Sequence, residues 1–139
     1  MNKEFIPPLG ALALKELGFD EPCIGFYKGN YDVKAVDQHW GSSISGISKK
    51  GGYRIDDLVL APTFSQAFRW FRDKYELHSW ITIELGATLT FCWVISGEHK
   101  GTEHKPYLKT YEEAEIQCLG RLISIVNEKQ ATKKAKESI

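Results

Sequence analysis

The clearest periodic pattern of apolar positions in the chain lies between residues 63 and 75. Its aromatic residues recur at spacings of four, three and four, and they are Phe64, Phe68, Phe71 and Tyr75. At 3.6 residues per turn these spacings place all four on one helix face, which predicts a buried stripe. Thr63 follows Pro62 and precedes Gln66 by three residues, so the pattern also predicts an N-cap with a capping box.

Trp70 lies on a different face of this predicted helix from the aromatic stripe. One interpretation is a second packing surface or a dimer contact, because tryptophan is usually buried. The other is a contact with a partner protein through Arg69, Trp70 and Arg72, because tryptophan and arginine are enriched at binding hot spots.

Shorter patterns predict the remaining elements. Pro7 and Pro8 before an apolar run that ends at Gly18 predict a helix over residues 8–17. Apolar and alternating runs predict strands over 23–27 and 31–36, paired as a hairpin, and over 79–85 and 89–95, paired as a second hairpin.

The strand predicted over 89–95 is apolar on both faces, which is typical of a central strand covered on both sides or of an oligomer contact. The polar stretch 97–106 is predicted to be a loop. Thr110, with Glu113 three residues later, predicts a second capping box at the start of a last helix. Residues 129–139 are predicted to form a frayed polar tail.

This order of elements predicts an α+β fold, with an antiparallel sheet built from two hairpins and three amphipathic helices packed on it. We expect one globular domain over residues 1–128, followed by the tail 129–139. The glycine- and serine-rich segment 37–54 carries no clear pattern, and it is interpreted as a long loop or a weaker hairpin.

Charge and composition narrow the function classes. The chain has 139 residues, with 18 lysines and arginines against 18 acidic residues, and a formal net charge of zero. This balance argues against a dedicated nucleic-acid binder, which needs clustered positive charge. No apolar run approaches the roughly 20 residues that cross a bilayer, and no secretory signal is recognisable, so we expect a cytoplasmic protein. The three cysteines, Cys23, Cys92 and Cys118, are predicted to be buried.

Few residue patterns suggest chemistry. The segment 98–104 contains two histidines and two glutamates, but its spacing matches no known metal motif. Glu115 lies within the apolar face of the last helix, where a carboxylate is either functional or paired. A pairing of Cys23 or Cys92 with His39 or His78 as nucleophile and base has no support in the spacing.

A nucleic-acid surface is the alternative to protein contact. It would combine Arg69, Trp70, Arg72 and Lys74 with four lysines of the tail, namely Lys129, Lys133, Lys134 and Lys136. Aromatic stacking over a basic groove is how single strands are held. Interleaved acidic residues and the zero net charge favour a solvated helix face instead.

Three blocks of the chain, residues 11–23, 61–75 and 111–115, resemble a family of short uncharacterised proteins from phages and prophages of Bacteroides-type gut bacteria. The resemblance covers about half the chain. It implies a cytoplasmic accessory protein of phage origin and implies no activity, cofactor or catalytic residue. The sequence therefore predicts a non-enzymatic accessory protein that contacts an unknown protein partner, with a homodimer as one form of that contact. No catalytic, cofactor-binding or metal-binding residue is assigned.

Overall fold

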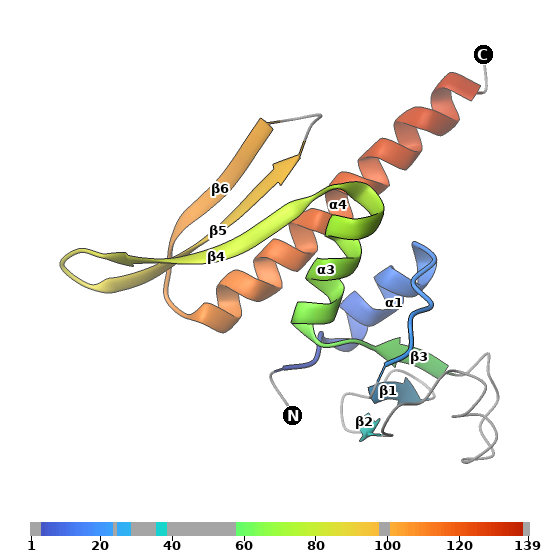
Figure 1. Cartoon of the computed structure of the whole chain (residues 1–139), viewed down its shortest axis with the longest axis horizontal. Helices are drawn as coiled ribbons and strands as arrows, with labels where there is room; N and C mark the ends of the chain where they lie inside the picture. The colour runs from blue at the N-terminus through green and yellow to red at the C-terminus, as the bar shows by residue number, and fades with distance from the viewer. Residues whose placement is uncertain (1–3, 24, 29–35, 39–57, 98–100, 138–139) are drawn as a thin grey trace. The chain divides into compact units, whose positions relative to one another are not determined.

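The computed structural model describes residues 4–23, 25–28, 36–38, 58–97 and 101–137 (Figure 1). The chain divides into two compact units, Met1–Ala67 and Phe68–Ile139. Helix α3 begins in the first unit and ends in the second, and each unit is described by itself. The organisation as a single domain stays a prediction.

Helix α1 (Pro8–Glu16) begins at the predicted residue and ends one residue before the predicted end, with Leu17 as its C-cap. It begins on a proline, whose missing N–H costs nothing in the first turn. It ends where Gly18 adopts a φ of 95° and the Phe19 N–H donates to the Leu14 carbonyl oxygen at 2.9 Å. This Schellman closure explains the glycine, since a side chain in the left-handed region is strained.

The first unit contains a three-stranded antiparallel sheet in the order β2-β1-β3. Strand β1 (Gly25–Lys28) pairs with β2 (Val36–Gln38) on one side and with β3 (Leu58–Ala61) on the other. Of the predicted partner strand 31–36, only Val36 is among the described residues, and it pairs with Tyr27 of β1. Residues 29–35 lie outside the described residues. Most of the segment 37–54 also lies outside them, and only positions 37 and 38 are placed, in β2.

Helix α3 (Phe64–Tyr75) matches the predicted helix, although half of its capping box differs. The Gln66 N–H donates to Thr63 Oγ1 at 3.2 Å, as predicted. The Gln66 side chain does not return to the cap but donates to the Pro22 carbonyl oxygen at 2.9 Å. The glutamine therefore ties the start of the helix to the segment that precedes β1.

The second unit contains a separate antiparallel sheet in the order β4-β5-β6. Strands β4 (His78–Leu85) and β5 (Leu89–Gly97) form the predicted second hairpin, and β5 is the central strand. Strand β6 (Gly101–Leu108) corrects the prediction of a polar loop over 97–106. The prediction was wrong because β6 is an edge strand with mostly exposed side chains, so its polar composition imitates that of a loop.

Helix α4 (Tyr111–Glu137) is longer than predicted. The Glu113 N–H donates to Thr110 Oγ1 at 3.0 Å, which confirms the N-cap. Residues 129–137, predicted to be part of a frayed tail, continue the helix. They are mostly lysine, glutamate, alanine and glutamine, which are strong helix formers, and no glycine or proline interrupts them.

The α+β class is confirmed, but the two predicted hairpins lie in different sheets rather than in one. Helix α4 covers one face of the β4-β5-β6 sheet (Figure 1). On that face the ring of Phe91 meets Tyr111 edge to face at 6.0 Å, and the helix buries Ala114, Cys118, Leu119, Leu122 and Val126. This apolar layer is the core of the second unit.

Candidate interaction groove

The three residues predicted to contact a partner do not share one exposed surface. Trp70 is only 6% exposed, with its ring edge-on to Phe71 at 5.1 Å and to Tyr75 at 5.4 Å. Arg69 is exposed, and so is Arg72, whose Nε lies 3.7 Å from Asp73 Oδ1. The geometry favours the packing interpretation of Trp70.

The buried stripe of α3 is rotated slightly from the predicted one. Ala67 is fully buried and Trp70 nearly so, whereas Phe68 and Tyr75 are half-buried. The spacing of large side chains identified the helix but not its innermost line. Ala67 is part of the innermost line because its small side chain allows close packing. A search for large apolar residues does not detect such a position.

A groove of about 690 Å3 opens in the second unit. Its walls come from the end of α3, from the paired ends of β5 and β6, and from the C-terminal half of α4. Its floor is aliphatic, formed by Leu77, Ile95, Ile125 and Val126. The volume of this groove and its apolar lining are typical of ligand-binding sites in proteins.

Two glycines shape the mouth of this groove. Gly97 and Gly101 face each other across β5 and β6. A Cβ on Gly97 would lie 2.8 Å from Leu77 Cδ2, so a larger residue there would make the Leu77 side chain shift. Gly101 has a φ of 69°, in the left-handed region that favours glycine. Neither role was recognised from the sequence, because the close approach joins segments twenty residues apart.

Helix α4 contributes a row of cations to the groove. Lys129, Lys133 and Lys136 are spaced by four and three residues, which puts them on one helix face, and all three line the groove. Within the described part of the chain, none of these three lysines forms an ion pair. Lys74 lines the opposite wall, with Nζ 5.0 Å from the centre of the Trp70 ring. The fold thus gathers Lys74 and three lysines of the predicted tail in one place.

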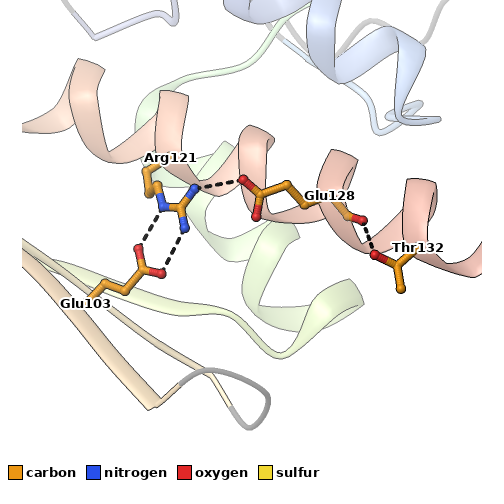
Figure 2. Close-up of polar contacts among 4 residues, drawn as sticks. All are labelled: Glu103, Arg121, Glu128 and Thr132. Atoms are coloured by element: carbon orange, nitrogen blue, oxygen red, sulfur yellow. Dashed lines mark hydrogen bonds and ion pairs between the residues drawn. The ribbon is translucent and has the colours of Figure 1, made fainter.

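Arg121 offsets part of the negative charge near these lysines (Figure 2). Its guanidinium donates to both oxygens of Glu103, at 2.7 and 2.9 Å, and to Glu128 Oε1 at 3.2 Å. Glu103 and Glu128 both line the groove. The α4 wall carries three lysines and Glu128, whereas Asp73 and Glu76 lie on the opposite wall, so the α4 wall is the basic side of the groove.

The predicted metal-capable segment 98–104 lies partly outside the described residues, which include only its last four positions. Of these, Glu103 is engaged by Arg121, and His104 is exposed on β6. In the described part of the chain, no group of three metal-capable side chains comes together.

The three cysteines are buried, as predicted. Burial raises the pKa of the Cys23 and Cys118 thiols to about 12, so both are protonated at neutral pH. A nucleophilic cysteine needs a lowered pKa and some exposure, so neither residue fits that role. His78 is exposed on β4, and His39 lies outside the described residues.

Glu115 lies outside the groove, in the first half of α4, and is half-buried. Burial, and to a smaller extent the nearby Glu112, raise the pKa of its carboxyl group above the ordinary value. The folded state therefore binds this proton more tightly than the unfolded state, and stability falls as the pH rises through the raised pKa.

We expect Glu115→Gln to stabilise the protein at pH 7, because the substitution removes a carboxylate that folding makes harder to ionise. Below the unfolded-state pKa of about 4.3 both side chains are neutral, and the difference should vanish. Urea unfolding of both proteins at pH 7 and near pH 3.5 measures this. A variant that is less stable at pH 7 would mean that the Glu115 carboxylate has a stabilising partner.

No family model, curated protein or solved structure matches the chain. None of the described helices combines the length and the apolar character that a membrane span requires.

Proposed function

We propose that the protein is a non-enzymatic, cytoplasmic accessory protein of phage origin that binds a partner protein through the groove of the second unit. The observation that carries this proposal is the row formed by Lys129, Lys133 and Lys136 beside an aliphatic floor. The phage origin rests on the resemblance of the three sequence blocks.

The occupant we propose is an acidic amphipathic helix of the partner. The α4 wall from Ile125 to Lys136 is about 17 Å long at 1.5 Å per residue, which is about three helical turns. A helix of that length with apolar residues at i, i+3, i+4 and i+7 would cover the floor. Glutamates or aspartates flanking that stripe would face the lysines, and such complementarity sets specificity and association rate.

Nucleic acid is the less favoured occupant. Single-strand binding uses exposed aromatic rings over a continuous basic path. The buried Trp70 offers no stacking platform, and Asp73 and Glu76 flank Lys74 on the α3 wall. An aliphatic floor suits a peptide better than a phosphate backbone.

The probe that tests this proposal is a labelled three-turn helical peptide with leucines at i, i+3, i+4 and i+7 and glutamates beside them. Fluorescence anisotropy would measure its affinity for the wild type and for Lys129→Glu/Lys133→Glu. We expect at least about a tenfold loss in the double variant, since two attractive contacts become repulsive. The control is Lys134→Glu, which changes a lysine of the same helix that does not line the groove.

Three outcomes count against the proposal. The peptide fails to bind, or the double variant binds it as well as the wild type does, or Lys134→Glu weakens binding equally. A labelled single-stranded DNA that binds more tightly than the peptide, and is released by salt, would establish the nucleic-acid alternative instead. Affinity capture from host lysate at two salt concentrations would then identify the natural partner.

A further inference from the structure

The two outer edges of the β4-β5-β6 sheet differ in how well they are protected. Strand β6 carries Pro106, which has no N–H, and Tyr107, which has a φ of 66°, and its register with β5 shifts between Phe91 and Trp93. Such features discourage edge-to-edge pairing. Strand β4 is eight residues long, contains no proline or glycine, and pairs along its whole length with β5. Among the described residues, no strand pairs with its other edge.

The hydrogen bond at the β4–β5 turn shows which backbone groups of β4 point outward. Leu85 lies opposite Leu89, and the Gly86 N–H donates to the Thr88 carbonyl oxygen at 3.3 Å. This makes Leu85 and Leu89 a non-hydrogen-bonded pair, and the two kinds of pair alternate along an antiparallel ladder. The N–H and C=O groups that face away from β5 therefore belong to Ser79, Ile81, Ile83 and Leu85.

Two of the residues whose backbone groups face away from β5 also carry exposed apolar side chains. Ile83 is 60% exposed and Leu85 is 87% exposed, and both lie on the same sheet face as Phe91, which α4 contacts through Tyr111. The hairpin end of β4 and β5 extends past the start of α4, which leaves this end of the face uncovered by the helix (Figure 1). Exposed apolar residues beside an unpaired strand edge are a surface that favours association.

We propose that β4 pairs antiparallel with β4 of a second copy of the chain, about a two-fold axis, so that two three-stranded sheets become one sheet of six strands. The side chains of β4 are complementary to themselves in the register centred on Ile81. There His78 lies opposite Glu84 of the second copy, twice by symmetry, and Ser79 lies opposite Ile83. No like charges face each other, which favours a second copy over an unrelated strand.

The even-numbered positions form non-hydrogen-bonded pairs in this register, in which side chains approach most closely. The exposed Trp80, on the same sheet face as His78, would lie opposite Thr82 of the second copy. This association involves neither the groove lysines nor the aliphatic floor of the groove. Its test is therefore independent of the test of the proposed function.

Sedimentation equilibrium of the full chain tests the association. We expect the wild type to reach twice the mass of one chain as concentration rises, and Ile83→Lys to raise the dissociation constant at least about tenfold. The matched control is Ile116→Lys, because Ile116 is 49% exposed on α4 but lies away from the β4 edge, and it should associate like the wild type. A wild type that stays monomeric, or an Ile83→Lys variant that associates unchanged, overturns the proposal.

Amide hydrogen exchange tests the edge itself. In the dimer the N–H groups of Ile81 and Ile83 are bonded to the second copy, so their exchange should slow as concentration rises. The N–H groups of Trp80 and Thr82, already bonded to β5, should change much less. Uniform exchange at all four positions, independent of concentration, contradicts pairing through β4.

Charge reversal tests the register. His78→Glu places two glutamates opposite each other in each half of the interface and should weaken association several-fold. Adding Glu84→Lys should restore the wild-type dissociation constant. If His78→Glu associates normally, or if the double variant is not restored, the register centred on Ile81 is wrong.

Discussion

Replacing Trp70 by alanine is expected to lower the free energy of unfolding by about 3–5 kcal/mol, the usual cost of truncating a large buried aromatic side chain. Trp70 is 6% exposed and packs edge-on against Phe71 and Tyr75. The substitution would leave a cavity beside α3 and remove the cation–π contact between Lys74 and the Trp70 ring. Urea unfolding followed by far-ultraviolet circular dichroism measures the loss.

The matched control for this prediction is Arg69→Ala, one residue earlier on an exposed position of the same helix. It should change stability by no more than about 0.5 kcal/mol. If Trp70→Ala instead kept its stability and lost binding to a partner, Trp70 would be a contact residue, and the packing interpretation would be wrong.

Replacing Arg121 by methionine is expected to lower the free energy of unfolding by about 2 kcal/mol, because charge-assisted, bidentate hydrogen bonds are among the stronger polar contacts. The side chains of Arg121 and Glu103 are 28% and 29% exposed, so solvent screens them only in part. Their contact joins the middle of α4 to β6, and the substitution would remove the Arg121 cation from the half-buried Glu103 carboxylate. Thermal and urea unfolding both report this loss.

A double-mutant cycle separates the ion pair from the packing of the arginine stem. Glu103→Gln and Arg121→Met, alone and together, should show a coupling energy of about 1–2 kcal/mol. The control is Arg72→Ala, because the Arg72–Asp73 pair is 3.7 Å long with side chains 51% and 69% exposed, and such pairs contribute little. A coupling energy near zero between Arg121 and Glu103 would show that solvent screening cancels the stabilisation expected from the bidentate contact.

The proposed groove and the proposed dimer use different parts of the second unit. The groove lies at the C-terminal half of α4, whereas the β4 edge carries its exposed apolar side chains toward the hairpin turn. A protein with both would present two copies of the groove, one on each side of a two-fold axis. Two linked sites bind a partner that also has two sites more tightly than either site alone.

The sequence by itself determined the elements whose patterns are local. Spacing and caps predicted α1, α3 and the start of α4. Thr63 and Thr110 each accept an N–H from the residue three positions later, and backbone bonds around Gly18 close α1. Alternation predicted the β4–β5 hairpin, and the apolar residues on both faces of β5 predicted its central place, because such strands are typical of the middle of a sheet. These features depend on contacts between residues that are close along the chain.

Only the tertiary structure decided the rest. Strand β6 looks like a loop because edge strands bury little, and its place depends on pairing with β5. The helical wheel left two interpretations of Trp70, packing or partner contact, and its burial depends on what surrounds the helix. The groove joins residues 73–77 with the ends of β5 and β6 and with the C-terminal half of α4, and no local pattern connects them. The sequence suggests that the lysines after residue 128 belong to a solvated tail. In the structure α4 continues past most of them, and three form one wall of the groove. Packing between segments that are distant in the sequence sets the position of that wall.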